Sequence, residues 1–309
     1  MLDWLAPAGE PAVLVTVARA EGSVPREAGA HMLVTAGGQQ DTIGGGHLEL
    51  KALGVAREML AGDLAAGPRV RLARFPLGPS LGQCCGGVVW LLFEYVTQAL
   101  EDNLQQLRQR RQQDSCRVTA IDGEPETRLV EERHAETHIR TDEAGRRWLV
   151  DPVTRPRSHL VLFGAGHVGA AIVRALAELP CTVTWVDERD AMFPAAVPDN
   201  VRIEATDTPE ACVNDAPDGA SYLVMTHSHA LDQRLCEAIL SRDNVGWFGL
   251  IGSQTKRAQF TNRLEAKGLS AETMVCPVGL PGIINKAPAV IAASVAAQLL
   301  MVWESQPKD

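Results

Sequence analysis

The stretch that decides the fold is Leu160-Val-Leu-Phe-Gly-Ala-Gly-His-Val-Gly169. Four apolar residues, followed at once by glycines in the pattern Gly-x-Gly-x-x-Gly, predict a buried strand, a tight turn and the start of a helix. Gly164 permits the turn, Gly166 lets a pyrophosphate approach the backbone, and Gly169 lets the helix pack closely on the strand. His167 lies inside this turn, so it joins the glycines as a candidate cofactor-binding residue.

The residues that follow complete a nucleotide-type fold. Apolar residues recur from Val168 to Leu176 at a spacing of four, which places them on one helical face. The next apolar strand, Thr182–Asp187, ends in an acid that can hold a ribose hydroxyl. Strands then alternate with helical patterns, as βαβ units on a parallel sheet do. We therefore expect an α/β protein whose residues 158–309 form a Rossmann-like doubly wound parallel sheet.

Two histidines follow the strand expected at residues 221–226, at the sheet edge where ligands of open α/β folds bind. His227 and His229 can line a ligand cleft or form a satisfied structural pair. With Asp232 they can also be interpreted as a metal site, since two imidazoles and a carboxylate suit zinc or iron. No other His/Cys pair with ligand spacing accompanies them, so we expect no metal held by the protein alone.

A second candidate anion site follows the strand expected at residues 247–251. Gly252, Ser253 and Lys256 combine a flexible turn, a hydroxyl and a cation at a helix start. The alternative is that Ser253 simply caps the helix while the cations that follow are solvated. Both interpretations stay open at the level of sequence.

Residues 1–96 predict a smaller α+β domain that carries a third Gly-rich turn. Gly44, Gly45 and Gly46 join a short strand to a helical pattern that begins near His47. Several N–H groups at such a helix start can hold a phosphate, although tight β-turns alone also explain three glycines. Arg26, in the loop upstream, can fork onto an anionic group. Residues 97–157 are polar and charged, and we expect a connecting region there.

Two adjacent thiols, Cys84 and Cys85, follow Gln83 in a Gly-rich loop. They can be small buried side chains, or a soft donor pair that meets sulfur or a transition metal. The other five cysteines are isolated or lie in apolar stretches, which is typical of packing.

Composition excludes several classes of protein. The 309 residues are 46% hydrophobic and 22% charged, as in soluble globular proteins, so a disordered or fibrous chain is excluded. With 29 basic and 38 acidic side chains the net charge is −9, and no basic patch reverses that field. We therefore expect neither nucleic acid nor a membrane surface as a partner.

Three features favour the cytoplasm. Residues 1–5 show no basic segment followed by an apolar core, so they do not resemble a signal peptide. The longest apolar run, Ala287–Trp303, contains proline and polar residues, which favours a buried helix over a membrane span. An odd number of cysteines, seven, without an export signal is typical of reduced thiols.

Eight motifs, in this order along the chain, resemble the XdhC/CoxI family of accessory proteins of molybdenum hydroxylases. They are Gly22–Glu27, Thr42–Glu49, Leu81–Gly87, Phe163–Gly169, Val186–Arg189, Thr226–His229, Gly249–Ser253 and Lys286–Pro288. The resemblance spans residues 12–303. It departs from the family pattern in the last helix, where Val290 and Gln298 stand in place of acids.

The resemblance implies a non-catalytic chaperone that binds the molybdenum cofactor (molybdopterin) as cargo. Such a protein helps the cofactor to gain its sulfido ligand and delivers it to the molybdenum subunit of apo-xanthine dehydrogenase. Further partners to consider are a cysteine desulfurase and cofactor-synthesis proteins, and we expect a homodimer. The alternative is an NAD(P)-dependent oxidoreductase that uses the Rossmann-like domain.

For the carrier role, we expect the cargo's phosphate at one of the Gly-rich helix starts, a thiol at its metal end, and a cleft between the domains. The candidate cofactor-binding residues are Arg26, Gly44, Gly45, Gly46, His47, Gln83, Cys84, Cys85, Gly164, Gly166, His167, Gly169, Asp187, His227, His229, Gly252, Ser253 and Lys256.

Overall fold

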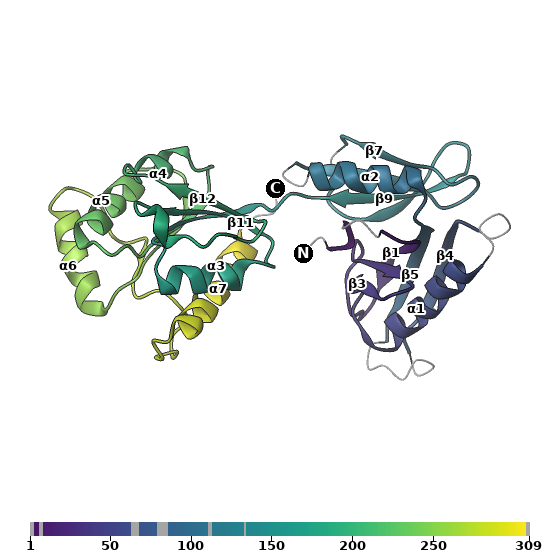
Figure 1. The fold of residues 1–309 in the computed structure, drawn as a ribbon, viewed down its shortest axis with the longest axis horizontal. Coiled ribbons are helices and arrows are strands. Elements are labelled where there is room, and N and C mark those ends of the chain that lie inside the picture. The colour runs from purple at the N-terminus through teal and green to yellow at the C-terminus, as the bar shows by residue number, and fades with distance from the viewer. Residues whose placement is uncertain are drawn as a thin grey trace. The chain divides into compact units, whose positions relative to one another are not determined.

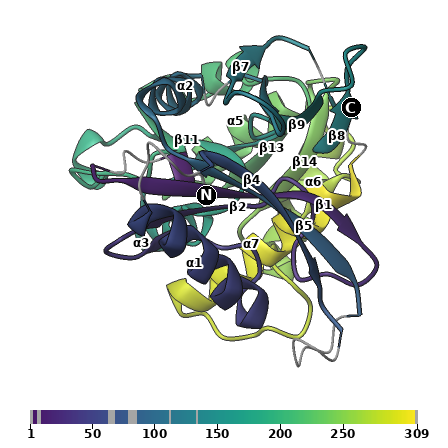
Figure 2. The same cartoon turned by 90° about the vertical axis from the view of Figure 1, so that its right-hand side faces the viewer.

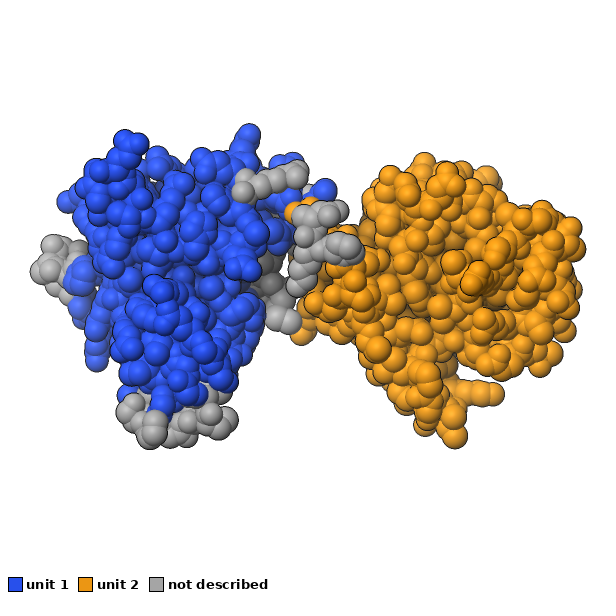
Figure 3. Space-filling view, turned by 180° about the vertical axis from the view of Figure 1, so that it is seen from behind, with its two compact units in different colours: residues 1–155 blue, residues 156–309 orange. Residues whose placement is uncertain are grey.

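The computed structural model describes residues 3–5, 9–62, 68–78, 86–110, 113–132 and 134–306. The chain divides into two compact units, Met1–Arg155 and Pro156–Asp309, coloured blue and orange in Figure 3. Unit 1 is built on antiparallel sheets and unit 2 on a parallel one. The expected α/β class is therefore confirmed, with two units of nearly equal length.

The first sheet of unit 1 is antiparallel, with strand order β3-β2-β1-β5-β4. Its elements are β1 (Ala12–Glu21), β2 (His31–Thr35), β3 (Gln39–Asp41), β4 (Val70–Pro76) and β5 (Val88–Tyr95), with η1 (Asp3–Leu5) before them and α1 (Gly46–Ala61) between β3 and β4. Side chains alternate along β1, so Val13 and Val15 face α1 while Leu14 faces the other way. α1 thus covers one face of this sheet (Figures 1 and 2).

Of residues 97–157, where the sequence predicts a polar connecting region, all up to Arg155 lie in unit 1. They form α2 (Gln98–Gln109), β6 (Ser115–Ala120), β7 (Thr127–Val130), β8 (His138–Thr141) and β9 (Arg147–Val153), with sheet order β7-β6-β9-β8. Their polar composition hides a core, because β6 and β9 are buried on both faces. Val118 and Val150 pack together on one face, while Leu149 packs on the other against Ala18 and Leu92 of the first sheet. This second sheet and α2 lie on the face of the first sheet opposite α1 (Figures 1 and 2).

A buried charged network joins the two sheets of unit 1. Arg117, fully buried on β6, donates to Glu94 on β5 (2.7 Å) and to Asp151 on β9 (3.1 Å). Asp151 also contacts His31 of β2 at 2.9 Å, and the His31 ring stacks on Trp4. Burial alone would raise the pKa of Asp151, but His31 and Arg117 outweigh it and lower that pKa to about 2.

Unit 2 is a six-stranded parallel sheet with strand order β12-β11-β10-β13-β14-β15. The strands are β10 (Ser158–Phe163), β11 (Cys181–Asp187), β12 (Val201–Ala205), β13 (Ala220–Val224), β14 (Val245–Leu250) and β15 (Met274–Val275). The chain starts in the middle, moves outward to β12, and returns to continue from β13. This is the Rossmann order, and the reversal lies between β10 and β13.

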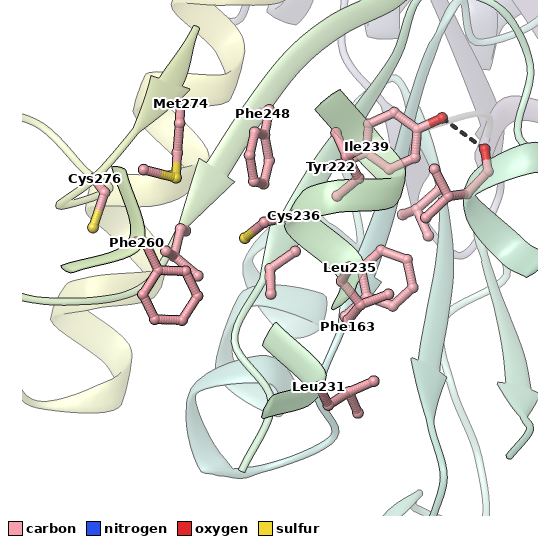
Figure 4. Packing of buried hydrophobic residues seen from close by; sticks show 14 of the residues in the cluster. Phe163, Tyr222, Leu231, Leu235, Cys236, Ile239, Phe248, Phe260, Met274 and Cys276 are labelled. Carbon is pink, nitrogen blue, oxygen red and sulfur yellow. Dashed lines mark hydrogen bonds between the residues drawn. The ribbon is translucent and has the colours of Figure 1, made fainter. Parts of the chain in front are cut away.

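Helices cover both faces of this sheet. They are α3 (His167–Leu176), α4 (Ala211–Asp215), α5 (His229–Leu240), α6 (Gln254–Glu265) and α7 (Pro288–Ser305), with η3 (Asp190–Met192) after β11. Because side chains alternate along β10, Leu162 packs with α3 and α7 while Phe163 packs with α5 and α6. Figure 4 shows the second of these clusters, in which the Tyr222 hydroxyl donates to the Val213 carbonyl (3.1 Å).

By length and composition α7 could cross a membrane. Its buried residues, among them Val295 and Leu299, lie in one cluster with α3 and the sheet. That is the place of a core helix, as expected from the interrupted apolar run. Gln298 and Ser294 on the same helix accept hydrogen bonds from the N–H groups of Gly279 and Leu280 (both 2.7 Å). These two hydrogen bonds hold the segment around Gly279, which precedes α7, against the helix.

Candidate functional site

The three glycines of the loop after β10 differ in how closely they are packed. Gly164 has φ +120°, and a Cβ there would lie 2.5 Å from the carbonyl oxygen of Met225. A Cβ on Gly169 would overlap the Gly164 carbonyl, which itself accepts from the Trp185 indole (3.0 Å). A Cβ on Gly166 would meet no atom within 4 Å. The loop is therefore tightly packed at Gly164 and Gly169, whereas the backbone of Gly166 faces open space. Gly166 lies at the start of α3, which no side chain caps.

Asp187, at the end of β11, accepts hydrogen bonds from neighbouring groups of the protein. Its Oδ2 accepts from the Ala165 N–H (2.7 Å) and from Nη2 of Arg189 (2.9 Å). Its Oδ1 accepts from the N–H (3.0 Å) and Nε (2.9 Å) of Arg189. Burial would raise the pKa of Asp187, yet these hydrogen bonds lower it. The sequence nominated this acid for a ribose hydroxyl, whereas the structure uses it to clamp the Gly-rich loop to β11.

A small depression lies at the carboxyl ends of β10, β11 and β13. Its lining residues are Phe163, Val186, Asp187, Glu188, Pro209, Thr226, His227 and Leu231. His227 is exposed and is one of these lining residues. His229 begins α5 instead, and its ring lies edge-on to Phe260. The exposed His167 opens α3.

The turn after β14 is held together from within. Ser253 caps α6 by accepting from the Lys256 N–H (3.2 Å). The Lys256 ammonium donates to Asp232 (2.7 Å) and to the Ile251 carbonyl (2.9 Å), and its stem lies against Gly252. Ser253 therefore caps the helix, as one of the two sequence interpretations had it. Lys256 is not solvated as that interpretation assumed, because it is paired with the buried carboxylate of Asp232.

Asp232 joins this turn to the one after β13. Its side chain is fully buried and accepts from both the N–H (3.0 Å) and the hydroxyl (2.7 Å) of Thr226. One carboxylate therefore fixes the backbone next to His227. Within the described ranges no group of three His, Cys, Asp or Glu side chains could hold a metal ion.

The three glycines before α1 all have positive φ, 115° for Gly44, 71° for Gly45 and 64° for Gly46. The turn they form already holds an anion, the carboxylate of Glu49. Its Oε2 accepts from the N–H groups of Ile43 and Gly45, each at 3.1 Å.

The other partners of that carboxylate are side chains. The Thr42 hydroxyl donates to Oε2, and the Gln39 amide donates to Oε1 at 2.8 Å. Burial would raise the pKa of Glu49, but these hydrogen bonds lower it. A phosphate at this turn must therefore replace or accompany a carboxylate. His47 is exposed on the first turn of α1.

Three motifs that lie far apart in the sequence meet at one edge of unit 1. A Cβ on Gly44 would overlap Pro25, and Nη1 of the neighbouring Arg26 donates to the Thr42 carbonyl (3.5 Å). The Gly87 N–H donates to the Ser23 carbonyl (3.1 Å), so the start of β5 lies against the same loop. Arg26 also pairs with Glu27 and keeps about a third of its side chain exposed.

The predicted Gln83, Cys84 and Cys85 lie outside the described residues. The five described cysteines are Cys116, Cys181, Cys212, Cys236 and Cys276. Burial raises the pKa of every one of them, to about 11 for Cys181. Such thiols are poor nucleophiles, as expected for packing residues.

Sequence reasoning missed the internal partners of these sites. Arg189 stands two residues after Asp187, and Glu49 stands in the first helical turn after the glycines. An acid in a first turn is a known signal for a capped N-terminus, so Glu49 could have been found. The pairing of Lys256 with Asp232 joins two helices. The two residues are 24 positions apart, so no local sequence pattern indicates the pair.

Comparison with known proteins gives two family matches. The model of the XdhC and CoxI family matches residues 5–72, and that of the XdhC Rossmann domain matches residues 160–299. The chain is also 26% identical to a Bacillus subtilis protein that is named a probable xanthine dehydrogenase subunit. That similarity covers 97% of this chain and 96% of the Bacillus subtilis protein.

Two further proteins are similar. The chain is 29% identical over 157 residues to the uncharacterized protein YqeB of Escherichia coli, half of this chain but only 28% of that protein. A crystal structure described as a xanthine dehydrogenase from Bacillus halodurans superposes with a TM-score of 0.77 and 21% identity. It covers 99% of this chain and 96% of that chain, and the likeness supports a shared fold.

Proposed function

Because this chain belongs to the XdhC and CoxI family, we propose that it is an accessory protein in the maturation of xanthine dehydrogenase. In this proposal it binds the molybdenum cofactor as cargo, assists its sulfuration and inserts it into the apoenzyme, which is its partner. The full-length similarity to a Bacillus subtilis protein named for xanthine dehydrogenase supports the choice of partner. We place this role in the cytoplasm and expect a homodimer.

The observation that carries the proposal is the meeting of three motifs at one edge of unit 1. Gly44 fits against Pro25, and Gly87 is hydrogen-bonded to Ser23. The segments involved are joined by backbone contacts at the margin of the sheet, where loops commonly carry function. Of the described side chains there, Arg26 offers an exposed guanidinium.

The chemistry of the cargo matches this edge. The molybdopterin of the cofactor carries a phosphate and a dithiolene, and the sulfido ligand on its molybdenum is easily lost. Since Glu49 already fills the Gly-rich turn, we assign the phosphate to Arg26, whose planar guanidinium can bind it through two N–H groups. On sequence grounds alone, Cys84 and Cys85 are proposed to face the metal end.

The first test is anaerobic purification of the chain, followed by molybdenum and pterin analysis with NAD(P) assayed in the same sample. We expect stoichiometric pterin that restores activity when it is transferred to apo-xanthine dehydrogenase. Protein that holds NAD(P) and does not bind offered pterin would overturn the carrier role and favour the oxidoreductase alternative.

A variant pair tests the phosphate contact. Arg26→Ala should weaken binding of the isolated cofactor by about tenfold, the loss expected for one charge-assisted contact. Arg57→Ala, an exposed arginine on α1 of the same unit, is the matched control and should bind normally. Equal affinity of the two variants would remove Arg26 from the site.

A further inference from the structure

We propose that the outer edge of β4 in unit 1 binds an extended acidic segment of the apoenzyme, which adds a strand to the first sheet. The inference rests on the proposed function, because it names the surface that the partner protein would contact. Three observations carry it: the position of β4 at the end of the sheet, the incomplete burial of its side chains, and the positive charge along it.

β4 is the last strand of its sheet, so its outer side has no neighbouring strand among the described residues. Hydrogen bonds at both ends show which backbone groups face β5. The Tyr95 N–H donates to the Arg69 carbonyl (2.8 Å), and the Leu77 N–H donates to the Gly87 carbonyl (2.9 Å). In an antiparallel pair such bonds recur at every second residue. Three residues between these ends therefore direct their N–H and carbonyl groups outward: Val70, Leu72 and Arg74.

The side chains of β4 are poorly covered compared with those of its neighbour. None of its seven residues is buried, and the apolar Leu72 and Phe75 are only half-buried. In β5, five of eight residues are buried. A strand added outside β4 would cover these apolar side chains and bond to the outward backbone groups, which is how exposed sheet edges bind extended peptides.

The charge along this edge is positive, although the chain as a whole has a net charge of −9. Three exposed arginines lie on or beside β4: Arg69, Arg71 and Arg74. None of them forms an ion pair with a residue in the part of the chain that the structure describes. The acids on the adjoining strands are already paired, Glu21 with Arg19 and Glu94 with Arg117.

This charge favours one kind of occupant. If β4 paired with β4 of a second copy, arginines would stand next to arginines, and like charges on paired strands are destabilising. A nucleic acid lacks the alternating N–H and carbonyl groups that match a strand edge, and the net negative charge of the chain repels it at a distance. A peptide segment that carries carboxylates satisfies both the backbone and the guanidinium groups.

Arg74 is held in position for such a contact. On the face of the sheet away from α1, Trp90 of β5 lies between Arg74 of β4 and Arg19 of β1. The Cζ atoms of the two arginines lie 5.6 and 5.0 Å from the centre of the Trp90 ring. A guanidinium stacked on an aromatic ring keeps its N–H groups available for a carboxylate. Tryptophan and arginine are also enriched in protein interfaces.

The first test is binding of the full chain to immobilised apo-xanthine dehydrogenase, measured by biolayer interferometry. The double variant Arg71→Glu, Arg74→Glu should bind about a hundredfold more weakly, because two charge-assisted contacts of about tenfold each are lost. Arg57→Glu, the same change at an exposed site on α1, should bind normally. If the arginines only guarded the edge against aggregation, glutamates would guard it equally well and the affinity would be unchanged.

Amide hydrogen exchange, resolved to single residues, tests the strand addition itself. When the apoenzyme binds, the outward N–H groups of Val70, Leu72 and Arg74 should become protected. Those of Arg71 and Ala73, which face β5, should change little. Absence of this protection would overturn the proposal, and so would unchanged affinity of the double variant. A duplex oligonucleotide that bound the unmodified protein but not the double variant would also overturn it.

Failure of this inference can be told apart from failure of the proposed function. If the unmodified protein binds the apoenzyme but the double variant binds equally well, only the docking edge is wrong. If the unmodified protein does not bind the apoenzyme, the choice of partner is wrong together with the docking edge. Pterin content is measured on the isolated chain, so neither result decides whether the cofactor is its cargo.

Discussion

Several charged side chains at or near the Gly-rich turns hold backbone groups in place. Glu49 accepts from two N–H groups of the Gly-rich turn, and Asp187 accepts from Ala165 across the edge of the sheet. Lys256 donates a hydrogen bond to the backbone carbonyl of Ile251. Buried and half-buried backbone groups need partners, and at these turns nearby side chains supply some of them.

Replacing Glu49 tests this at one residue. Glu49→Gln keeps the shape but loses the charge, so the hydrogen bonds from Ile43 and Gly45 weaken. We expect the free energy of unfolding to fall by about 1 kcal/mol at pH 7, measured by urea denaturation. Glu58→Gln, an exposed position on the same helix, should be neutral.

The loss in free energy of unfolding caused by Glu49→Gln should also depend on pH. Because the folded pKa of Glu49 is lowered, its charge contributes stability above its unfolded pKa, and that contribution is lost as pH falls through the folded pKa. The difference between Glu49→Gln and the unmodified protein should therefore shrink on acidification. A deficit of the same size at pH 3 would contradict this account.

At the scale of elements, the loops of unit 2 are tied to one another by hydrogen bonds and packing. Asp232, in the first turn of α5, accepts hydrogen bonds from Thr226, which follows β13, and from Lys256 at the start of α6. The Gly-rich loop is packed on Met225 and Trp185 in the same way. The carboxyl edge of the sheet is thus a set of coupled turns, and a change in one turn affects its neighbours.

Lys256→Ala tests this coupling. The substitution leaves the fully buried Asp232 without its cation, and breaking such a pair costs roughly 3–5 kcal/mol. We expect a loss of that order in the unfolding of unit 2. Arg257→Ala, exposed on the next position, should change stability by less than about 0.5 kcal/mol. If Lys256→Ala were equally mild, Lys256 would be free to contact a ligand, as its sequence context suggested.

The glycines of the loop after β10 divide into two classes. The Cβ of Gly166→Ala meets no atom within 4 Å and the residue has φ −76°, so stability should be nearly unchanged. Gly169→Ala forces its Cβ onto the Gly164 carbonyl, and such overpacking costs about 1–3 kcal/mol. Thermal unfolding of the two variants measures this difference. A Gly166→Ala protein destabilised as much as Gly169→Ala would contradict the division.

At the scale of the whole molecule, each unit has cores of its own and is expected to respond to acid differently. In unit 1 the folded pKa of Asp151 is about 2, below its ordinary value of 3.8. Its ion pairs therefore contribute stability that is complete above about pH 4 and is lost as pH falls toward 2. That loss amounts to about 2 kcal/mol.

Urea titrations at pH 5, 4 and 3, read by pulsed hydrogen-exchange mass spectrometry, follow the two units separately. Peptides of the two sheets of unit 1 should unfold at progressively lower urea as the pH falls. In Asp151→Asn this shift should be much smaller, although the variant starts from lower stability because Arg117 and His31 lose a partner. An equal acid response of Asp151→Asn and the unmodified protein would contradict the assignment.

The sequence predicts unit 2 better than unit 1, for a physical reason. The Rossmann order follows from a local signal, the glycines after Phe163 together with an apolar strand that ends at Asp187. The second sheet of unit 1 has no such signal, because its fully buried residues include Arg117 and Asp151, which are neutralised only by partners distant in sequence. For the candidate site, the glycines were found from sequence, while the partners that fill the turns depend on tertiary contacts.

The buried cysteines bear on any route that sulfur takes through this chain. A thiol must ionise before it can attack a sulfane sulfur, and burial raises the pKa of all five described thiols. Of the seven cysteines in the chain, Cys84 and Cys85 lie outside the described residues, and they are the two that we propose as persulfide acceptors. If radiolabelled sulfur becomes covalently attached to this protein, it should be found on one tryptic peptide.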